Sequence, residues 1–147
     1  MSAPPSTEKP RPPFPQSEYY SAFFWEHTKR HELAIQRCDR CHRYQHWPTP
    51  VCRHCSSFDL SPAVVSGRGT LYTYTIAMQS FHPYFDDKVP FVLAVVELEE
   101  QPGLKMVTNI VECAEDEVTI GMPVEVVFED VTDDVTFPQF RPVRDAS

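Results

Sequence analysis

The sequence predicts a mainly β protein built from two modules that follow a proline-rich start. Three observations support this. Four of the five cysteines form two CxxC pairs before residue 60, the later part is a series of β-patterned segments separated by turns, and charge is divided unequally between the two parts. A chain of 147 residues is long enough for one domain with a small appended module.

The composition is that of a globular protein, with 41% hydrophobic and 23% charged residues. No apolar run approaches the ~20 residues of a membrane-spanning helix. The N-terminus also lacks the charged-then-apolar pattern of a secretory signal. We therefore expect a cytoplasmic protein that makes no contact with membranes.

The first segment, residues 1–16, is unusually rich in proline. A stretch of this composition cannot pack a core, so we predict an extended flexible arm, and residues 144–147 form a short tail. Six of the 15 prolines fall within it: Pro4, Pro5, Pro10, Pro12, Pro13 and Pro15.

Residues 17–32 are predicted to form an aromatic amphipathic helix. Ser17 and Glu18 have the residue types of a helix cap and an acidic first turn. The helix would either pack on its own module, or dock on a partner or line an acyl pocket. Its apolar face has a three- and four-residue spacing and comprises Tyr20, Phe23, Phe24 and His27, with Tyr19 and Trp25 close by.

Residues 33–60 are predicted to form a metal-binding ribbon, with short strands over 33–37 and 43–47. The pattern Cys38-x2-Cys41-x10-Cys52-x2-Cys55 places two thiolates on one side of each tight turn. Two facing turns make a closed tetrahedral site of four sulfurs, which suits Zn²⁺ and leaves no open position. We therefore expect structural rather than catalytic zinc.

Alternatives to this zinc site remain open from the sequence. They are an iron site of the same geometry, two disulfides in an oxidising compartment, and a redox-active CxxC pair. A histidine could also replace one thiolate, the candidates being His42, His46 and His54. Glycine often follows the second cysteine of such a turn. His42 and Ser56 stand there instead and tolerate the tight turn less well.

Residues 61–143 are predicted to form a small closed Greek-key barrel of about five strands. Turns are expected at Pro102-Gly103 and Gly121, with one helical turn over 114–118 before the fourth strand. Cys113 is expected to be a small buried residue. The predicted strands are 70–78, 91–98, 104–112, 122–129 and 137–141.

Charge separates the two modules and bears on function. The first 60 residues carry 8 Lys/Arg and 6 Asp/Glu, whereas the remaining 87 carry 5 and 15. An acidic barrel argues against nucleic acid as a partner, because neutralisation of phosphates dominates that affinity. A less favoured alternative is single-strand binding by Tyr72 and Tyr74, whose rings could stack on bases.

Several blocks together resemble the acyl-CoA-associated zinc-ribbon/OB-fold family, of the domain of unknown function 35 type. The aromatic helix and the four-cysteine ribbon fit this family over roughly residues 17–143. The missing glycines of the two turns and the long arm depart from it. The further matching blocks are Gly67-Arg68-Gly69-Thr70-Leu71-Tyr72-Thr73-Tyr74-Thr75, Pro90–Leu98, Gly121-Met122-Pro123-Val124-Glu125-Val126 and Phe140-Arg141-Pro142.

The resemblance implies a rubredoxin-like zinc ribbon, an OB-fold barrel and a role as a non-catalytic accessory subunit. Such proteins accompany thiolase-like enzymes that act on CoA thioesters. Some pair with a thiolase homologue to form a lyase, an aldolase that cleaves a β-hydroxy acyl-CoA in steroid side-chain degradation, with the catalytic groups on the partner. We expect a hetero-tetramer with a thiolase-like homodimer. A scaffold or acyl-CoA-binding subunit for other thiolase-type chemistry is the alternative.

Residues that could touch the partner or CoA come from the helix, the ribbon and the barrel. Basic side chains could meet CoA phosphates or an acidic surface. Arg68 stands between glycines that would let a ligand approach the backbone. His82, with Asp86 and Asp87, forms the one polar cluster suited to acid–base work by a stand-alone enzyme. The candidates are Tyr20, Phe23, Phe24, Trp25, Arg37, Arg40, Arg68 and His82.

Overall fold

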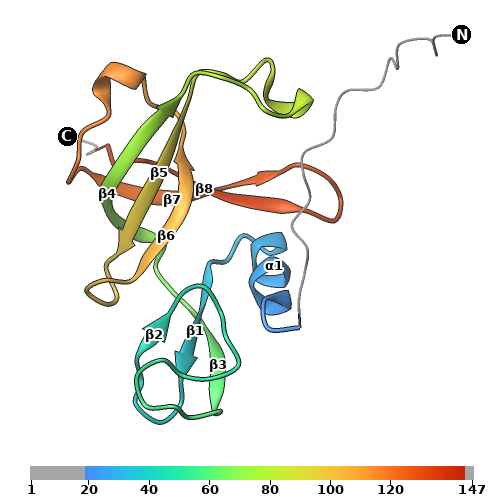
Figure 1. The fold of residues 1–147 in the computed structure, drawn as a ribbon, viewed down its shortest axis with the longest axis vertical. Coiled ribbons are helices and arrows are strands. Elements are labelled where there is room, and N and C mark those ends of the chain that lie inside the picture. Colours follow the sequence, from blue (N-terminus) through green and yellow to red (C-terminus); the bar gives the residue numbers. More distant parts are fainter. Residues whose placement is uncertain (1–18, 145–147) are drawn as a thin grey trace, which may run out of the picture.

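A computed structural model describes residues 19–144 of the chain (Figure 1). The predicted arm and the predicted helix start at Ser17 and Glu18 lie outside the described residues. The elements are α1 (Ala22–Lys29), β1 (Ala34–Cys38), β2 (Tyr44–Gln45), β3 (Leu60–Val64), β4 (Arg68–Ala77), η1 (Pro83–Phe85), β5 (Phe91–Leu98), β6 (Lys105–Ile110), η2 (Glu115–Glu117), β7 (Pro123–Asp130) and β8 (Thr136–Pro142).

The helix α1 is shorter than the aromatic segment that predicts it. Tyr19–Ser21 form a turn before it, and the backbone of His31 just beyond its end has a φ of 59°, in the left-handed region. A non-glycine residue in that conformation cannot continue a right-handed helix. The chain therefore leaves α1 and enters β1 within a few residues.

The ribbon is a three-stranded antiparallel sheet in the order β2-β1-β3. The two strands that flank the first CxxC turn are confirmed as β1 and β2. The sequence reasoning missed β3, which pairs with all of β1, from Cys38↔Leu60 to Ala34↔Val64. Pro62 lies within β3, and proline is tolerated there because β3 is an edge strand.

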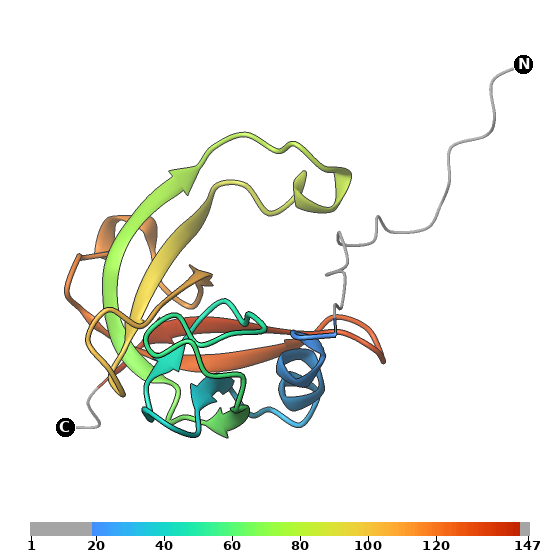
Figure 2. The same ribbon diagram turned by 60° about the horizontal axis from the view of Figure 1, so that its bottom comes forward.

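The barrel closes in the order β4-β5-β6-β8-β7, which confirms the predicted five-strand barrel and mainly β class. Figure 2 shows β4 curving around it. The predicted helical turn before the fourth strand is η2. Closure is weak at one seam: β6 and β8 run parallel and meet at the single pair Ile110↔Phe140.

The core lies inside this barrel. Val96, Val124 and Phe140 have 0% of their surface exposed. Two glycines make the packing possible: Gly69 in β4 and Gly67 just before it. A Cβ on Gly69 would lie 2.3 Å from the Glu97 carbonyl oxygen, and a Cβ on Gly67 would lie 2.3 Å from Val126 Cγ1.

The ribbon and α1 are fixed to the barrel by specific contacts. The Gln101 side chain, from the β5–β6 turn, accepts from the Tyr44 backbone N–H (2.9 Å) and donates to the Tyr44 carbonyl (3.0 Å). It thereby extends the edge of β2. On the other side, the His31 ring stacks on Phe128. Both views show α1 beside the β7–β8 hairpin (Figures 1 and 2).

Among residues 19–144, none of the helices is both long enough and apolar enough to cross a membrane.

Candidate metal centre and adjacent cavity

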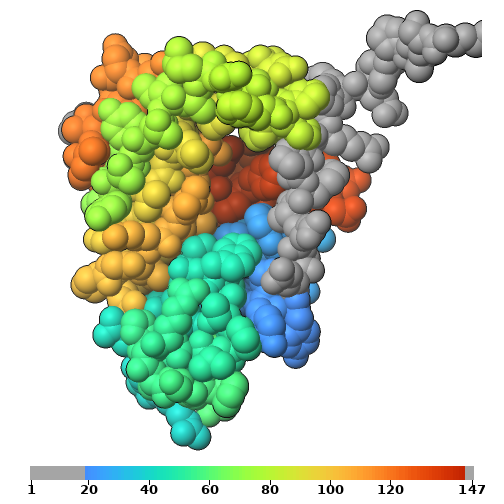
Figure 3. Space-filling model, in the orientation of Figure 1, coloured from blue at the N-terminus to red at the C-terminus, as the bar shows by residue number. Residues whose placement is uncertain are grey.

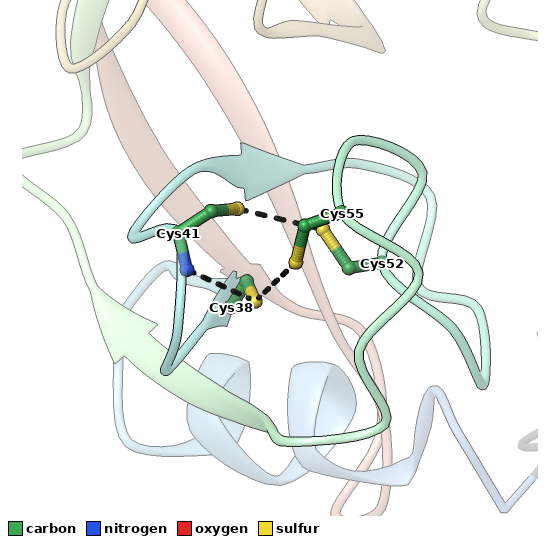
Figure 4. A group of neighbouring side chains, drawn as sticks. All are labelled: Cys38, Cys41, Cys52 and Cys55. Atoms are coloured by element: carbon green, nitrogen blue, oxygen red, sulfur yellow. Dashed lines mark hydrogen bonds between the residues drawn. The ribbon is translucent and has the colours of Figure 1, made fainter.

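The four predicted ligands come together at the end of the ribbon (Figure 4). Their sulfur atoms all lie within 4.8 Å of one another. The Cys38–Cys55 and Cys41–Cys52 sulfurs are 3.5 and 3.6 Å apart. A tetrahedral site with Zn–S bonds of about 2.3 Å requires sulfurs about 3.8 Å apart, so the cluster fits structural zinc.

Backbone N–H groups point at the sulfurs and favour the thiolate form that a metal needs. The Cys41 N–H donates to Cys38 Sγ at 3.5 Å and is the largest influence that lowers the pKa of the Cys38 thiol, to about 6. The His54 N–H donates to Cys52 Sγ at 3.4 Å. The lowered pKa values of Cys38 and Cys52 reduce the number of protons that Zn²⁺ binding must displace. Cys55 differs: although the Ser57 backbone N–H favours its thiolate, the hydrogen-bonded Cys38 sulfur raises the pKa of the Cys55 thiol to about 12. Metal binding must therefore displace the proton of Cys55.

Both CxxC turns adopt the same conformation although neither has the usual glycine. The His42 N–H donates to the Cys38 carbonyl and the Ser56 N–H to the Cys52 carbonyl, each at 3.0 Å. The φ angles of His42 and Ser56 are 63° and 65°, in the left-handed region. The two turns therefore form at the cost of local backbone strain, which metal coordination by the two cysteines of each turn would offset.

A polar network that the sequence reasoning missed supports the second turn. Gln45 Nε2 donates to Gln36 Oε1 at 2.6 Å and to Thr49 Oγ1 at 2.8 Å. Gln45 Oε1 accepts from the Arg53 backbone N–H at 2.9 Å. Both glutamines are buried, so their amides are tied to the loop that carries Cys52. In the sequence, this network is indicated by one glutamine in each of the two neighbouring predicted strands.

The ribbon histidines stay outside the cluster of potential ligands in the described part of the chain. His42 and His54 are exposed, whereas His46 is half-buried, with its ring against Phe24 of the helix. Burial, assisted by the nearby Arg53 charge, lowers the pKa of His46 to about 4, so its ring is neutral at neutral pH. The thiolates therefore remain the best ligand set.

A cavity of about 500 Å³ lies between α1, the β2–β3 loop and the seam of the barrel. Its neighbour of about 290 Å³ shares Asn109, Phe137 and Gln139 with it. Figure 3 looks onto this hollow, with the red strand β8 at its floor. Aromatic side chains dominate the walls of the larger cavity: Phe24, Trp25, His46, Trp47 and Phe137.

The candidate aromatic residues of the helix divide between interior and surface. Phe24 is 2% exposed, and its ring packs on Trp25 and Trp47. It holds the helix in place rather than offering a surface. Phe23 is half-buried against the core and Trp25 lines the cavity. Tyr20 is 43% exposed and is the most accessible of the four predicted contacts.

The candidate basic residues already have intramolecular partners. Arg37 donates to the His42 carbonyl and lies over the Tyr44 ring. Arg40 pairs with Asp59 at 3.0 Å, and Arg68 with Glu99 at 3.3 Å. All three pairs are at the surface, where exchange for a stronger anionic partner costs little. The glycines beside Arg68 serve strand packing, because β5 and β7 fill their free space.

The predicted acid–base cluster does not assemble. His82 Nδ1 accepts from the Tyr84 backbone N–H at 3.1 Å and so caps η1. It makes no hydrogen bond to Asp86 or Asp87 in the part of the chain that the structure describes. Cys113 is half-buried against the barrel core, and this burial raises the pKa of its thiol.

Comparison with known proteins matches both modules to family models. Residues 25–61 match the ChsH2 rubredoxin-like zinc ribbon domain, and residues 63–129 match the ChsH2 C-terminal OB-fold domain. A DUF35 domain-containing scaffold protein of Methanocaldococcus jannaschii is 33% identical over 82% of this chain and 89% of its own length. The chain therefore belongs to the DUF35 family of zinc-ribbon and OB-fold proteins, as the sequence blocks predicted.

Two longer bacterial relatives are also similar. A probable enoyl-CoA hydratase alpha subunit of Thermomonospora curvata is 40% identical over 94% of this chain. A 3-oxo-4,17-pregnadiene-20-carboxyl-CoA hydratase alpha subunit of Mycobacterium tuberculosis is 38% identical over 81% of this chain. This chain spans only 41% and 37% of their lengths.

Among solved structures, the Ltp2-ChsH2(DUF35) aldolase contains a chain that superposes with a TM-score of 0.80 at 40% identity. The match covers 88% of this chain and 98% of that one. The similarity therefore includes helix, ribbon and barrel together rather than one module.

Proposed function

We propose that this chain is a non-catalytic subunit of a thiolase-like enzyme, and that the complex cleaves a β-hydroxy acyl-CoA by a retro-aldol reaction. The observation that carries the proposal is the similarity to the ChsH2(DUF35) chain of an aldolase, at 40% identity over 98% of that chain. This coverage supports an equivalent place in an assembly of the same kind.

The geometry of the metal centre supports an accessory role. Four thiolates that enclose one ion leave no coordination position for substrate or water. When bound, Zn²⁺ would supply structural cross-linking of the two CxxC turns. The chain's own residues then hold α1 and the ribbon at a fixed angle to the barrel, through Gln101, His31 and Phe137.

The face formed by α1 and the ribbon is the candidate contact surface for the catalytic subunit. It exposes Tyr19, Tyr20 and Trp47 to 90, 43 and 41%. Exposed aromatic side chains of this kind are typical anchors in protein interfaces. Arg37 and Arg40 lie on the same module and would add electrostatic attraction to an acidic surface or to CoA phosphates.

A steroid-derived acyl-CoA is the proposed substrate class of the complex. The M. tuberculosis relative is named for a pregnadiene carboxyl-CoA, and the T. curvata relative for an enoyl-CoA. Hydration of an enoyl-CoA gives a β-hydroxy acyl-CoA, which is the substrate that a retro-aldol step needs. The names of these relatives therefore support a hydration reaction that would supply the substrate of the proposed retro-aldol step.

Affinity purification from the native host, followed by mass spectrometry and light scattering, tests the proposal. We expect a thiolase-like protein in a 1:1 ratio, within a hetero-tetramer built on a homodimer of that partner. The reconstituted pair should release a carbonyl fragment and a shortened acyl-CoA. Retention of full activity by the partner alone would contradict the proposal.

A scaffold role in other thiolase-type chemistry is the second candidate, and the similarity to a DUF35 scaffold protein favours it. The products distinguish the two functions. Carbon–carbon bond formation or thiolysis by the complex, without a released aldehyde or ketone, would support the scaffold role and exclude the aldolase.

A further inference from the structure

The closure of the barrel leaves part of one strand edge without a partner strand. The Leu98 N–H donates to the Leu104 carbonyl at 2.8 Å, so alternate residues of β6, counted from Leu104, direct their backbone groups to β5. The backbone N–H and C=O of Lys105 and Val107 therefore point the other way, toward β8. In the part of the chain that the structure describes, β8 pairs with β6 only at Ile110. An unpaired edge of this kind is a template for pairing with another extended chain.

The free edge borders a groove along the seam of the barrel (Figure 3). The larger cavity is lined by Lys105–Asn109 of β6 and, opposite them, by Phe137–Gln139 of β8. The smaller cavity shares Asn109 with it and continues along β6 to Val111. Their volumes of about 500 and 290 Å³ are comparable to those of sites that enclose a ligand. We call these two joined cavities the seam groove.

The charges along the seam groove favour an acidic occupant. Lys88 and Lys105 are the two lysines of the barrel region, residues 61–143, and each lines one of the two cavities. Among the described lining residues, Glu129 is the one acidic side chain. The rest of the barrel is different, because residues 61–147 carry 15 Asp/Glu and 5 Lys/Arg. Acidic side chains of an occupant would therefore be attracted to the two lysines.

An extended polypeptide fits the seam groove better than an apolar small molecule does. Main-chain groups on one edge of a strand repeat every two residues, or about 6.8 Å, so one extended chain can pair with both Lys105 and Val107. Its side chains would lie against the aromatic wall that includes Trp25, Trp47 and Phe137. Trp47 is 41% exposed and belongs both to this wall and to the face of α1 and the ribbon. The seam groove is thus continuous with the proposed contact surface, so one partner can cover both.

We propose that the thiolase-like catalytic subunit inserts an extended segment, apolar with acidic flanks, into the seam groove and pairs it with the free edge of β6. The inference rests on the proposed function, because it states how that partner attaches. The main-chain groups of the segment would pair with Lys105 and Val107, and its carboxylates would meet Lys88 and Lys105. Attachment through the main chain makes docking depend on the Val107 N–H rather than on the Val107 side chain.

The first test removes the Val107 N–H. Val107→Pro deletes this donor, whereas the matched control Val107→Ala keeps the N–H and shortens the side chain. Proline is tolerated on an edge strand where its position needs no ladder hydrogen bond, and zinc content and far-UV circular dichroism check that each variant is folded. The probe is the co-purified thiolase-like subunit. We expect its Kd to rise at least tenfold for Val107→Pro and less than threefold for Val107→Ala. Equal Kd values for the two variants would overturn the proposal.

Hydrogen exchange tests the proposal without a substitution. In the isolated full chain, the Lys105 and Val107 amides should exchange at least tenfold faster than those of Met106 and Thr108, which pair with β5. Addition of the thiolase-like subunit should slow the first two amides at least tenfold, as measured by mass spectrometry with fragmentation to single residues. Unchanged exchange in a complex that does form would overturn the strand pairing and leave the proposed function intact.

Three further outcomes of these experiments would also overturn the proposal. Failure to recover any thiolase-like protein would overturn it together with the proposed function. Protection of the Lys105 and Val107 amides by coenzyme A alone would assign the seam groove to that ligand. Protection that increases with the concentration of the isolated chain would assign the groove to a second copy.

Discussion

The ribbon and the barrel are stabilised by different means, and the difference shows how a short acidic chain supports two modules. The barrel has a contiguous apolar core whose members include Leu71, Val96 and Phe140. The ribbon places a four-sulfur cluster and a buried glutamine network where an apolar core would be. A module of this size cannot bury enough apolar surface, so metal ligands replace it.

The largest expected effect is that of removing the metal, which should unfold one module and spare the other. In Cys52→Ser, or with excess chelator, we expect the ribbon to unfold while the barrel persists, since structural zinc supplies roughly 10 kcal/mol or more of folding free energy. Hydrogen exchange should show lost protection in β1 and β3 and retained protection in β5. Cys113→Ser is the control and should keep full zinc content. Simultaneous loss of both modules would show that the barrel depends on the ribbon.

The reciprocal change weakens the barrel and spares the metal centre. Leu71 is 1% exposed, and Leu71→Ala should destabilise the barrel by about 2–5 kcal/mol because it leaves a cavity in the core. Chemical denaturation followed by far-UV circular dichroism measures this. Leu93→Ala, at an outward position that is 41% exposed, should change stability by less than about 0.5 kcal/mol. Equal effects of the two substitutions would contradict the assigned core.

Lowering the pH should destabilise the packing of the ribbon against α1 through protonation of His46. Its pKa in the folded protein is about 4, below the ordinary value near 6.5. The unfolded chain therefore binds the proton first, and stability falls as the pH decreases from 6.5 to 4, by about 3 kcal/mol at most. His46→Phe should remove this pH-dependent contribution. The free energy of unfolding, measured by denaturation at pH 7.0 and 5.5, should then change less between the two pH values than it does in the original chain. An unchanged difference, matching that of His82→Phe, would contradict the burial of a neutral His46.

The smallest expected effect concerns the strained turn of the ribbon. Ser56 is exposed and has a φ of 65°, so Ser56→Gly should stabilise the zinc-bound ribbon by about 1 kcal/mol. Competition with a chromophoric chelator should show slower zinc release. Ser56→Ala retains the strain and should show no gain. A gain for alanine equal to that for glycine would locate the effect in the hydroxyl rather than the backbone.

Much of the fold was accessible from local patterns. The cysteine spacing identified the four ligands, because a CxxC turn is a local structure that fixes two sulfurs by itself. The near-continuous apolar run over 91–98 identified β5 with its observed bounds. The turn signal at Pro102-Gly103 then placed its hairpin partner over 104–112, which contains β6. β3 was missed because Leu60–Val64 has neither alternation nor β-branched residues until its end.

The candidate contact residues show what local patterns cannot predict, which is the exposure of a side chain in the folded protein. Helical spacing grouped Phe24 with Tyr20 on one face, yet Phe24 is buried and Tyr20 is exposed. The glycines beside Arg68 suggested room for a ligand, but β5 and β7 take that room. In each case the residue's environment is set by elements far along the chain, which the local pattern does not contain.

The sequence by itself determined the four cysteine ligands, the β class and the division of charge, since these depend on residue types and short spacings. Only the tertiary structure decided which aromatic side chains are covered, how Gln101 joins the modules, and where the barrel seam leaves β6 unpaired beside a cavity. These features arise from contacts between residues such as Tyr44 and Gln101, 57 positions apart. Long-range packing selects them, and no local rule encodes it.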